Sequence, residues 1–332
     1  MAMSNPVLTD MAWSSSGAPD LAAAYEHCRR IHAAHGRTYY LATRMLPRDR
    51  RPDVWALYAF ARVADELVDA APSPDPAALL GWRDQAMAAL RSDSRPVPAG
   101  QPVLAATWHT MRALGIDPDL MQEFLDAMVM DLTITRYATW EDLRGYMRGS
   151  AAVIGELMAP LLGAKGPEAM SCAAALGEAF QLTNFIRDIG EDHARGRVYL
   201  PQADLARFGV SEALLAGAVR SGQPPAQVRS LVAFEVRRAI DLYAVAKPGL
   251  TMVDPRSRPC LEMAFTLYRR ILHRVIANDF NVFERRLVVP PWQLLATTGH
   301  VSARTVRARV TGVINVHQGF GSSHRSTPTR HS

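Results

Sequence analysis

The stretch that decides the fold runs over residues 175–201 and reads ALGEAFQLTNFIRDIGEDHARGRVYLP. Its polar residues recur every three or four positions, and this spacing predicts a helix with one polar face. The residues on that face are Gln181, Asn184, Asp188 and Asp192, with Arg187 and Glu191 beside them. Gly177 and Ala179 are small, which indicates close approach to another helix. The pattern is also typical of a charged surface helix, so this segment alone leaves both interpretations open.

A second stretch, LYAFARVADELVDA at residues 57–70, repeats the arrangement. Its polar residues fall within a narrow arc of the predicted helix, and they are Tyr58, Arg62, Asp65 and Asp69. The opposite side carries the apolar residues Phe60, Val63, Ala64 and Leu67. Two carboxylates four positions apart can present oxygens to Mg²⁺, which takes one or two carboxylates together with substrate phosphate oxygens. A solvated polar stripe on an amphipathic helix would show the same pattern.

The two segments together favour chemistry over a solvated surface. If the helices face each other across a cavity, their four carboxylates come close and repel one another unless divalent cations are present. Mg²⁺ ions and a diphosphate held by Arg62 and Arg187 would neutralise the set. The combination predicts a site that ionises an allylic diphosphate, in which metals stabilise the departing pyrophosphate and apolar walls keep water from the carbocation.

The remaining chain is helical in pattern almost throughout, with no repeat and few segments of strand-like alternation. Predicted helices cover residues 20–46, 51–70, 76–91, 103–114, 118–134, 140–163, 167–194, 224–248 and 257–287. Apolar residues of the fifth helix are expected to pack in a core, although part of them could line a prenyl tunnel; they are Met121, Phe124, Leu125, Met128, Met130 and Leu132. We therefore predict one all-α domain at 20–299, between a flexible leader at 1–19 and a basic, disordered tail at 300–332.

The composition excludes several classes of protein. The chain has 332 residues, of which 48% are hydrophobic and 21% charged, so it is neither fibrous nor wholly disordered. Its formal net charge of +5 equals the five arginines found after residue 286, a stretch without Asp or Glu. The folded body is thus electrically balanced, and nucleic acid is not expected as a partner. The tail is read as a solvated end or, alternatively, as a contact for anionic lipid.

Cysteine usage and hydropathy predict where the protein works. Cys28, Cys172 and Cys260 are far apart and show no metal-ligand spacing, which favours a reducing compartment. The first 20 residues lack the pattern of a secretory signal. The most apolar stretch, at 151–164, is shorter than the roughly 20 residues of a bilayer span. We expect a cytoplasmic protein with peripheral contact at the inner face of the membrane.

These motifs together resemble the squalene/phytoene synthase family, over roughly residues 22–298. The family's first aspartate-rich motif is matched by Asp65-Glu-Leu-Val-Asp69, and its second by residues 181–192, which continue into Gly196-Arg-Val-Tyr-Leu-Pro201. Further matches are His35-Gly-Arg-Thr-Tyr-Tyr40, Tyr146 ahead of Gly155-Glu-Leu-Met, Tyr268-Arg-Arg-Ile-Leu and residues 278–286. Arg148 and Ala152 depart from the family, which more often has an aromatic residue and a glycine there.

The resemblance implies roles for individual residues. Mg²⁺ and diphosphate would be bound by Asp65, Asp69, Asn184, Asp188 and Asp192. Contacts to substrate or diphosphate would come from His35, Tyr39, Tyr58, Arg62, Gln181, Arg187, Tyr268 and Arg285. Tyr146 matches a tyrosine implicated in proton handling near the cation, and is counted with the four aspartates as catalytic.

The resemblance also implies a fold and a reaction. The fold is a single-domain isoprenoid synthase-type helical bundle with a central apolar cavity. The enzyme would be a prenyltransferase of carotenoid biosynthesis that joins two geranylgeranyl diphosphates head to head, through a cyclopropylcarbinyl diphosphate, to phytoene. Mg²⁺ is the expected cofactor, with Mn²⁺ as a substitute and no need for NADPH. Two alternatives stay open: squalene or dehydrosqualene synthesis from farnesyl diphosphate, and a non-catalytic helical assembly protein.

Overall fold

The computed structural model describes residues 20–69, 76–92 and 100–284. The chain divides into two units, residues 1–289 and 290–332, and every described residue belongs to the first. The predicted leader at 1–19 and tail at 300–332 lie outside the described residues, so these two boundaries stay predictions.

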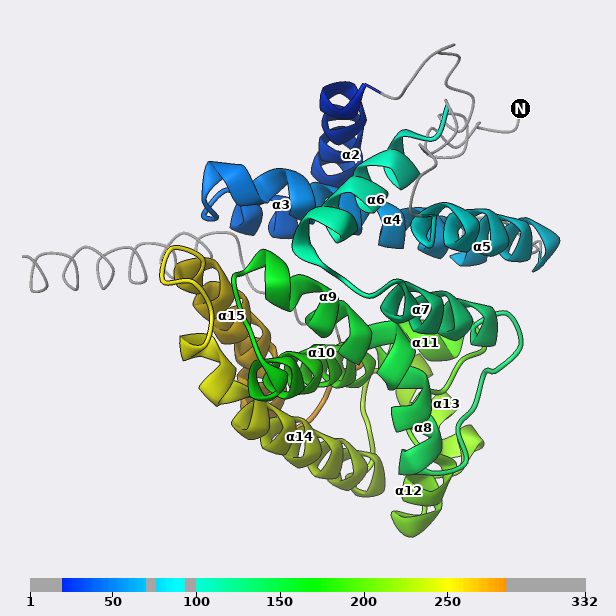
Figure 1. Cartoon of the computed structure of the whole chain (residues 1–332). Helices are drawn as coiled ribbons and strands as arrows, with labels where there is room; N and C mark the ends of the chain where they lie inside the picture. Colours follow the sequence, from blue (N-terminus) through cyan, green and yellow to red (C-terminus); the bar gives the residue numbers. More distant parts are fainter. Residues whose placement is uncertain (1–19, 70–75, 93–99, 285–332) are drawn as a thin grey trace, which may run out of the picture. The chain divides into compact units, whose positions relative to one another are not determined.

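Every regular element in the described ranges is helical (Figure 1). The α-helices are α2 (Leu21–His35), α3 (Arg37–Thr43), α4 (Arg51–Asp69), α5 (Pro76–Leu90), α6 (Pro102–Leu114), α7 (Pro118–Met130), α8 (Trp140–Met147), α9 (Val153–Leu161), α10 (Pro167–Arg187), α11 (Ile189–Ala194), α12 (Gln202–Arg207), α13 (Glu212–Ser221), α14 (Ala226–Ala246) and α15 (Arg258–Ala277). Three short helical segments, η1 (Arg48–Arg50), η2 (Arg148–Ala152) and η3 (Lys247–Thr251), complete the set. The all-α prediction is confirmed.

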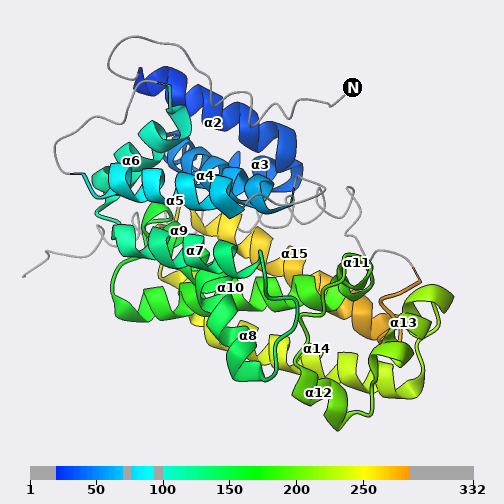
Figure 2. The ribbon, with the colours of Figure 1, turned by 90° about the vertical axis from the view of Figure 1, so that its right-hand side faces the viewer.

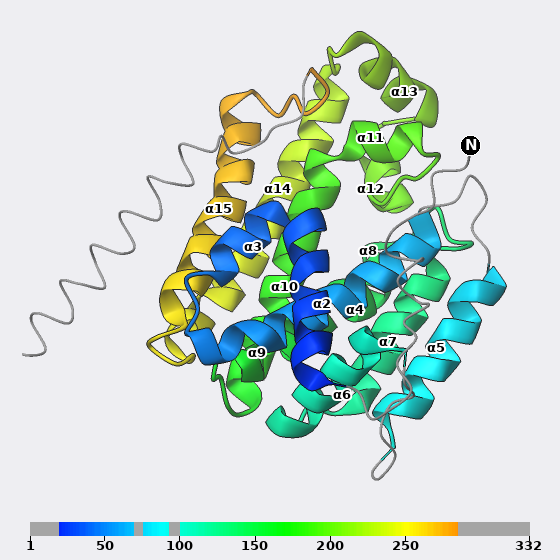
Figure 3. The same ribbon diagram turned by 90° about the horizontal axis from the view of Figure 1, so that it is seen from above.

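The helices form two groups in order of sequence. Helices α2 to α6 pack on one another, and Figure 2 shows them on one side of the group that begins with α7. In the second group α10 packs along α14 and also contacts α9 and α15 (Figure 3). Helix α10, at whose end the second aspartate-rich motif lies, is therefore surrounded by other helices. Helix α4, which carries the first, packs mainly against α2 and α6 and also contacts α5, α7 and α9.

Close packing around α10 depends on glycine. A Cβ atom added at Gly177 would lie 2.1 Å from the carbonyl oxygen of Ala151, and one at Gly155 would lie 2.0 Å from that of Ala173. Atoms cannot approach so closely, so only glycine allows these two backbones to meet. The prediction of close helix approach at Gly177 is confirmed.

Three predicted helices are interrupted. Residues 20–46 break at Gly36, where an added Cβ would lie 2.6 Å from the Tyr58 ring. Residues 140–163 contain the π-helical segment η2 between α8 and α9. Residues 167–194 break at Asp188, whose φ of −101° and ψ of 13° are not helical. Each break occurs where tertiary contacts or side-chain bonds outweigh local helix preference.

Two further differences lie in the second half of the chain. Helices α12 and α13 were not predicted, because each is short and lies among loop-forming residues. The last predicted helix, 257–287, ends earlier, at Ala277. Asp279 and Phe280 follow with φ of 50° and 57°, a left-handed conformation that stops a helix.

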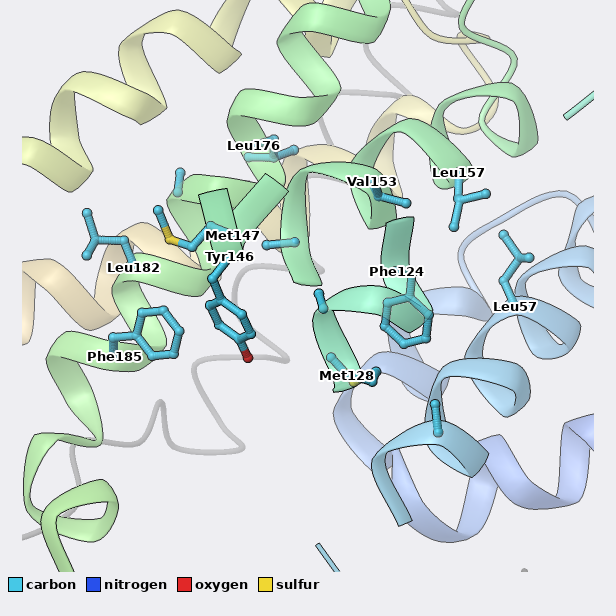
Figure 4. Close-up of a cluster of buried hydrophobic side chains, with 14 of the residues drawn as sticks. Leu57, Phe124, Met128, Tyr146, Met147, Val153, Leu157, Leu176, Leu182 and Phe185 are labelled. Atoms are coloured by element: carbon cyan, nitrogen blue, oxygen red, sulfur yellow. The ribbon is translucent and has the colours of Figure 1, made fainter. Parts of the chain in front are cut away.

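The core is continuous among the described residues, and Figure 4 shows the part between α4, α7, α8 and α10. Met121, Phe124, Leu125 and Met128 are all buried, as predicted. A cavity of about 10 Å³ lies nearby, lined by α10 to α14 and by the residues that follow α11. It has room for about one water molecule. The larger apolar cavity expected for a prenyl chain therefore stays a prediction.

Candidate active site

The first motif lies on α4, a helix without interruption from Arg51 to Asp69. Phe60, Val63 and Ala64 are buried on one side, whereas Tyr58, Arg62 and Asp65 are half-buried on the other. The predicted division of this helix into an apolar and a polar face is thus confirmed for these residues. Asp69 is the last residue of α4, and its side chain lies outside the described part of the structure.

A buried carboxylate, Glu66, organises the polar face of α4. It is 7% exposed, and its Oε1 forms an ion pair with Nη2 of Arg62, one helical turn before it. Nδ1 of His35, at the end of α2, lies 4.0 Å from the same oxygen. Glu66 therefore joins two predicted diphosphate contacts. Sequence reasoning missed it, although a Glu four positions after Arg62 inside the motif was a usable signal.

The Tyr58 ring is held in place by two residues at the end of α2, His32 and Gly36. Its ring stacks on His32 with centroids 4.0 Å apart, and it lies against Gly36, where no side chain would fit. His32 is 1% exposed, and burial lowers the pKa of its imidazole to about 4, so the ring is neutral at pH 7. Burial also raises the pKa of the Tyr58 hydroxyl. His32 is thus a buried, neutral support for the Tyr58 ring.

The second motif lies at the break between α10 and α11. The Arg187 guanidinium donates to both carboxylate oxygens of Asp188, from Nε at 2.7 Å and from Nη2 at 2.5 Å. The backbone N–H of Asp188 donates to the backbone carbonyl of Asn184 at 2.8 Å, and the backbone N–H of Asp192 donates to the backbone carbonyl of Asp188 at 2.9 Å. These two hydrogen bonds continue the helical turns across the break. Asn184, Asp188 and Asp192 therefore stay one turn apart and form a single cluster.

The electrostatics of this cluster suit a cation. Burial, and next the negative charge of Asp188, raise the pKa of the Asp192 carboxyl to about 7. The carboxylate repulsion predicted for a metal-free site is thus present within this motif. The Oδ1 atom of Asn184 is buried and has no hydrogen-bond partner among the described residues. Oxygen donors of this kind fit Mg²⁺, which keeps several waters and needs few protein ligands.

No three His, Cys, Asp or Glu side chains in the described ranges lie close enough to share one ion. Whether the two motifs share their ions stays a prediction, because the Asp69 side chain lies outside the described residues.

Tyr146 is buried at 3% exposure, at the end of α8 (Figure 4). Its hydroxyl donates to Oδ2 of Asp131 at 2.7 Å. Asp131 also accepts from Arg197, through Oδ1 at 2.8 Å and through its backbone carbonyl at 2.8 Å. Asp131 and Arg197 were not among the predicted site residues, because they lie 15 and 51 positions from Tyr146 and only the fold brings them together.

The other predicted residues are placed as follows. Tyr268 on α15 stacks on Phe180 of α10, with ring centroids 4.1 Å apart, which ties these two helices together. Gln181 is half-buried on α10. The Tyr39 side chain and the whole of Arg285 lie outside the described residues. The structure therefore brings together the residues within each motif, and the roles of all of them remain predictions.

Comparison with known proteins identifies the class. The squalene/phytoene synthase family model matches residues 32–293. A phytoene synthase of Arthrospira platensis is 35% identical over 81% of this chain and 89% of its own length. A 15-cis-phytoene synthase of Synechococcus elongatus is 33% identical over 83% of this chain and 92% of its own length. The chain belongs to the squalene/phytoene synthase family, and the predicted family is confirmed.

Solved structures agree with this assignment. A dehydrosqualene synthase solved with a ligand superposes with a TM-score of 0.76 at 26% identity, covering 86% of this chain and 97% of that one. A squalene synthase of Alicyclobacillus acidocaldarius gives a TM-score of 0.71 at 28% identity, with coverage of 82% and 99%. The isoprenoid synthase-type fold and a prenyltransferase-type enzyme are thus confirmed.

The comparisons also bear on the reaction and its setting. The relatives' names support the predicted phytoene synthase function, and the structural neighbours support the squalene-type alternative. The family uses prenyl diphosphates and generally depends on divalent metals. Within the described residues, no helix has the length and apolar character that crossing a membrane requires.

Proposed function

We propose that this chain makes phytoene from two molecules of geranylgeranyl diphosphate, with Mg²⁺ as cofactor. The observation that carries the proposal is the cluster at the α10–α11 break. There burial and the negative charge of Asp188 raise the pKa of the Asp192 carboxyl, and Oδ1 of Asn184 is buried without a hydrogen-bond partner among the described residues. Such a cluster needs a cation, and a prenyl diphosphate brings the phosphate oxygens that complete the coordination of Mg²⁺.

The metal ligands we propose are Asp65, Asp69, Asn184, Asp188 and Asp192. Bound there, Mg²⁺ supplies Lewis-acid stabilisation of the diphosphate leaving group. Arg62, held by Glu66, and His35 beside it offer positive charge and a hydrogen-bond donor to a diphosphate oxygen. Arg187 orients Asp188 through two hydrogen bonds. Loss of the diphosphate leaves an allylic cation, which the apolar side chains of the core protect from water.

Two observations favour phytoene over the C30 products. The curated relatives named phytoene synthase are 33–35% identical. The dehydrosqualene and squalene synthases among the solved structures are 26–28% identical. The fold is also similar to that of a dehydrosqualene synthase. Farnesyl diphosphate should therefore be tested as a substrate beside geranylgeranyl diphosphate.

A single set of incubations tests the proposal. Purified protein is given C15 or C20 diphosphate with Mg²⁺, with and without NADPH, and the hydrocarbons are identified by mass and retention. We expect phytoene from the C20 substrate, unchanged by NADPH, abolished by EDTA and restored by Mg²⁺ or Mn²⁺. Dehydrosqualene from the C15 substrate as the main product, or squalene that requires NADPH, would replace the proposal with the C30 alternative.

We further propose that the basic residues at 300–332 attract the enzyme to an anionic membrane, where its hydrocarbon product dissolves. The stretch after residue 286 has five arginines and no acidic residue. Each basic residue near such a surface contributes about 1 kcal/mol. Truncation after Gly299 should weaken binding to vesicles of anionic lipid and leave turnover of detergent-solubilised substrate unchanged. Vesicle binding that resists both truncation and high salt would refute this contact.

A further inference from the structure

The hydroxyl of Tyr146 is a buried polar group in the core that donates a hydrogen bond to a buried carboxylate, Asp131. Tyr146 is 3% exposed and Asp131 is 9% exposed, and their hydrogen bond of 2.7 Å joins the end of α8 to the residue that follows α7. A charge-assisted hydrogen bond of this length is among the stronger ones in proteins. The hydroxyl has one proton, so donation to Asp131 fixes which way the remaining lone pairs of the oxygen point.

Arg197 completes the arrangement from the other side. Its Nη1 donates to Oδ1 of Asp131 at 2.8 Å and to the Tyr199 hydroxyl at 3.1 Å, and its Nη2 donates to the Asp131 carbonyl at 2.8 Å. The charge of the buried carboxylate is therefore balanced, and its position is held by bonds to side chain and backbone together. A buried carboxylate without such a partner would carry a large desolvation cost.

Aromatic rings enclose the same group. The centroid of the Tyr146 ring lies 5.3 Å from the ring centroid of Tyr137, 6.0 Å from that of Tyr199 and 6.4 Å from that of Phe185. Burial and the nearby charge of Asp131 both hold the pKa of the Tyr146 hydroxyl well above its usual value. The side chain therefore stays a neutral phenol, whose oxygen is made more negative by the hydrogen bond that it donates.

The network also reaches the second aspartate-rich motif. The cavity of about 10 Å³ is lined by Asp192, Arg197, Tyr199 and Phe185, together with apolar residues. Arg197 thus contacts Asp131 and Tyr199, and both Arg197 and Tyr199 share a cavity with Asp192. Tyr146 is in this way linked to the motif proposed to hold the diphosphate.

We infer that Asp131, held by Arg197, is the positioning residue that fixes the Tyr146 hydroxyl as a neutral, polarised hydrogen-bond acceptor for the reacting part of the substrate. The inference rests on the proposed function, since it concerns the same site. A dipole whose negative end is fixed in a dry site stabilises a developing cation without reorganisation. Asp131 would act through Tyr146 and would not itself contact the substrate.

A double-mutant cycle on kcat tests this role. Tyr146→Phe removes the hydroxyl and is expected to lower kcat by about 100-fold, the lower end of what a positioned proton-handling group contributes. Asp131→Asn keeps the shape but loses the charge, and is expected to lower kcat by about tenfold with KM unchanged. If Asp131 acts through Tyr146, the double variant falls no further than Tyr146→Phe alone. Losses that multiply to about 1000-fold would overturn the inference.

Asp204→Asn is the matched control. Asp204 is also buried, at 8% exposure, and also accepts from an arginine, Arg238, at 2.9 Å, but no bond connects it to Tyr146 among those described. Its substitution should lower thermal stability while leaving kcat within about twofold. A loss of kcat in this control as large as in Asp131→Asn would show that any damaged buried pair slows the enzyme, and would count against the inference.

A second measurement needs no substrate. The midpoints of thermal unfolding of the two single variants and of the double variant should show coupling, with the double variant melting no lower than the less stable single variant. This coupling is expected even if wild-type protein makes a product other than phytoene, so failure of the proposed function can be told apart. Additive losses in the melting temperature would show that the two side chains do not act as a pair, and would overturn the inference.

Discussion

The two aspartate-rich motifs share a spacing but are built differently. The first lies on the uninterrupted helix α4 and is supported by side chains: His32 under Tyr58, and Glu66 beside Arg62. The second lies at a helix break: α10 is packed closely at Gly177, the chain turns at Asp188, and the Arg187 guanidinium holds the Asp188 carboxylate. Equal spacing in sequence therefore yields two kinds of site, one on a continuous helix supported by side chains and one at a helix break supported also by close backbone packing.

The difference teaches where each motif can tolerate change. Side-chain supports on α4 can be altered one at a time, so their loss should change substrate affinity or pH dependence. Backbone contacts at α10 leave no space for adjustment, since an interior packed to this density cannot absorb even a methyl group without displacement. The variants below test these expectations, from the largest effect to the smallest.

Loss of a proposed metal ligand should have the largest effect, and an equal one in both motifs. Asp69→Asn and Asp188→Asn should each lower turnover by about 100-fold or more, because one interaction with the charged transition state is worth several kcal/mol. Initial rates with C20 diphosphate and saturating Mg²⁺ would measure this. Neither variant should unfold at a lower temperature than wild type in the absence of ligand. Near-normal turnover in both would show that the aspartates do not bind the catalytic metals.

Gly177→Ala should be the most damaging change to the fold. The added methyl would lie 2.1 Å from a backbone oxygen of the neighbouring segment, so we expect a loss of about 3 kcal/mol in the free energy of unfolding. Gly145→Ala on α8 is the control, since no atom lies within 4 Å of its added methyl. Higher helix propensity should then stabilise it by about 0.5 kcal/mol. Urea denaturation measures the free energy of unfolding of both variants. Similar values for the two would show that the close packing at Gly177 does not constrain α10.

Glu66→Gln should raise KM for the diphosphate substrate about tenfold, with a smaller change in kcat. The neutral amide holds Arg62 and His35 less firmly, so more is lost when a diphosphate orders them. Glu235→Gln is the comparison, because Glu235 is also buried and paired with an arginine on its own helix, Arg238. That variant should lose stability but keep its KM. An unchanged KM in Glu66→Gln would show that the Glu66–Arg62 ion pair is only structural.

The free energy of unfolding should depend on pH because of His32, the buried residue that supports Tyr58 of α4. Burial lowers its pKa to about 4 in the folded chain, below the usual value of about 6.5. The unfolded chain therefore binds more protons between these values, so stability rises with pH through this range and is lost as the pH falls below 6.5. Between pH 7.5 and pH 5 the loss should be about 2 kcal/mol. His32→Phe, which keeps a stacked ring, should remove this part of the difference, and an unchanged pH profile in that variant would contradict the assignment.

Much of the fold could be predicted from sequence, because helices are encoded by local periodicity. The extents of α4, α5, α6 and α14 agree with prediction to within two residues. The prediction that three of the helices are continuous was wrong. Gly36, Asp188 and the segment η2 interrupt these helices, although the apolar periodicity of the sequence continues through each break. Periodicity records which residues are apolar, and it does not record the ring of Tyr58 against Gly36 or the guanidinium of Arg187 on Asp188.

The sequence by itself predicted the chemistry of the site. Two aspartate-rich segments, each with an arginine, indicated a diphosphate and Mg²⁺, because residue type and spacing limit which ligands a helix face can bind. Only the tertiary structure decided which groups support that face. Glu66 is buried, with Nδ1 of His35 4.0 Å from its Oε1, and Asp131 accepts a hydrogen bond from the Tyr146 hydroxyl while Arg197 balances the charge of Asp131. Burial and pairing between distant residues depend on how helices pack, and a helix pattern carries no information about its neighbours.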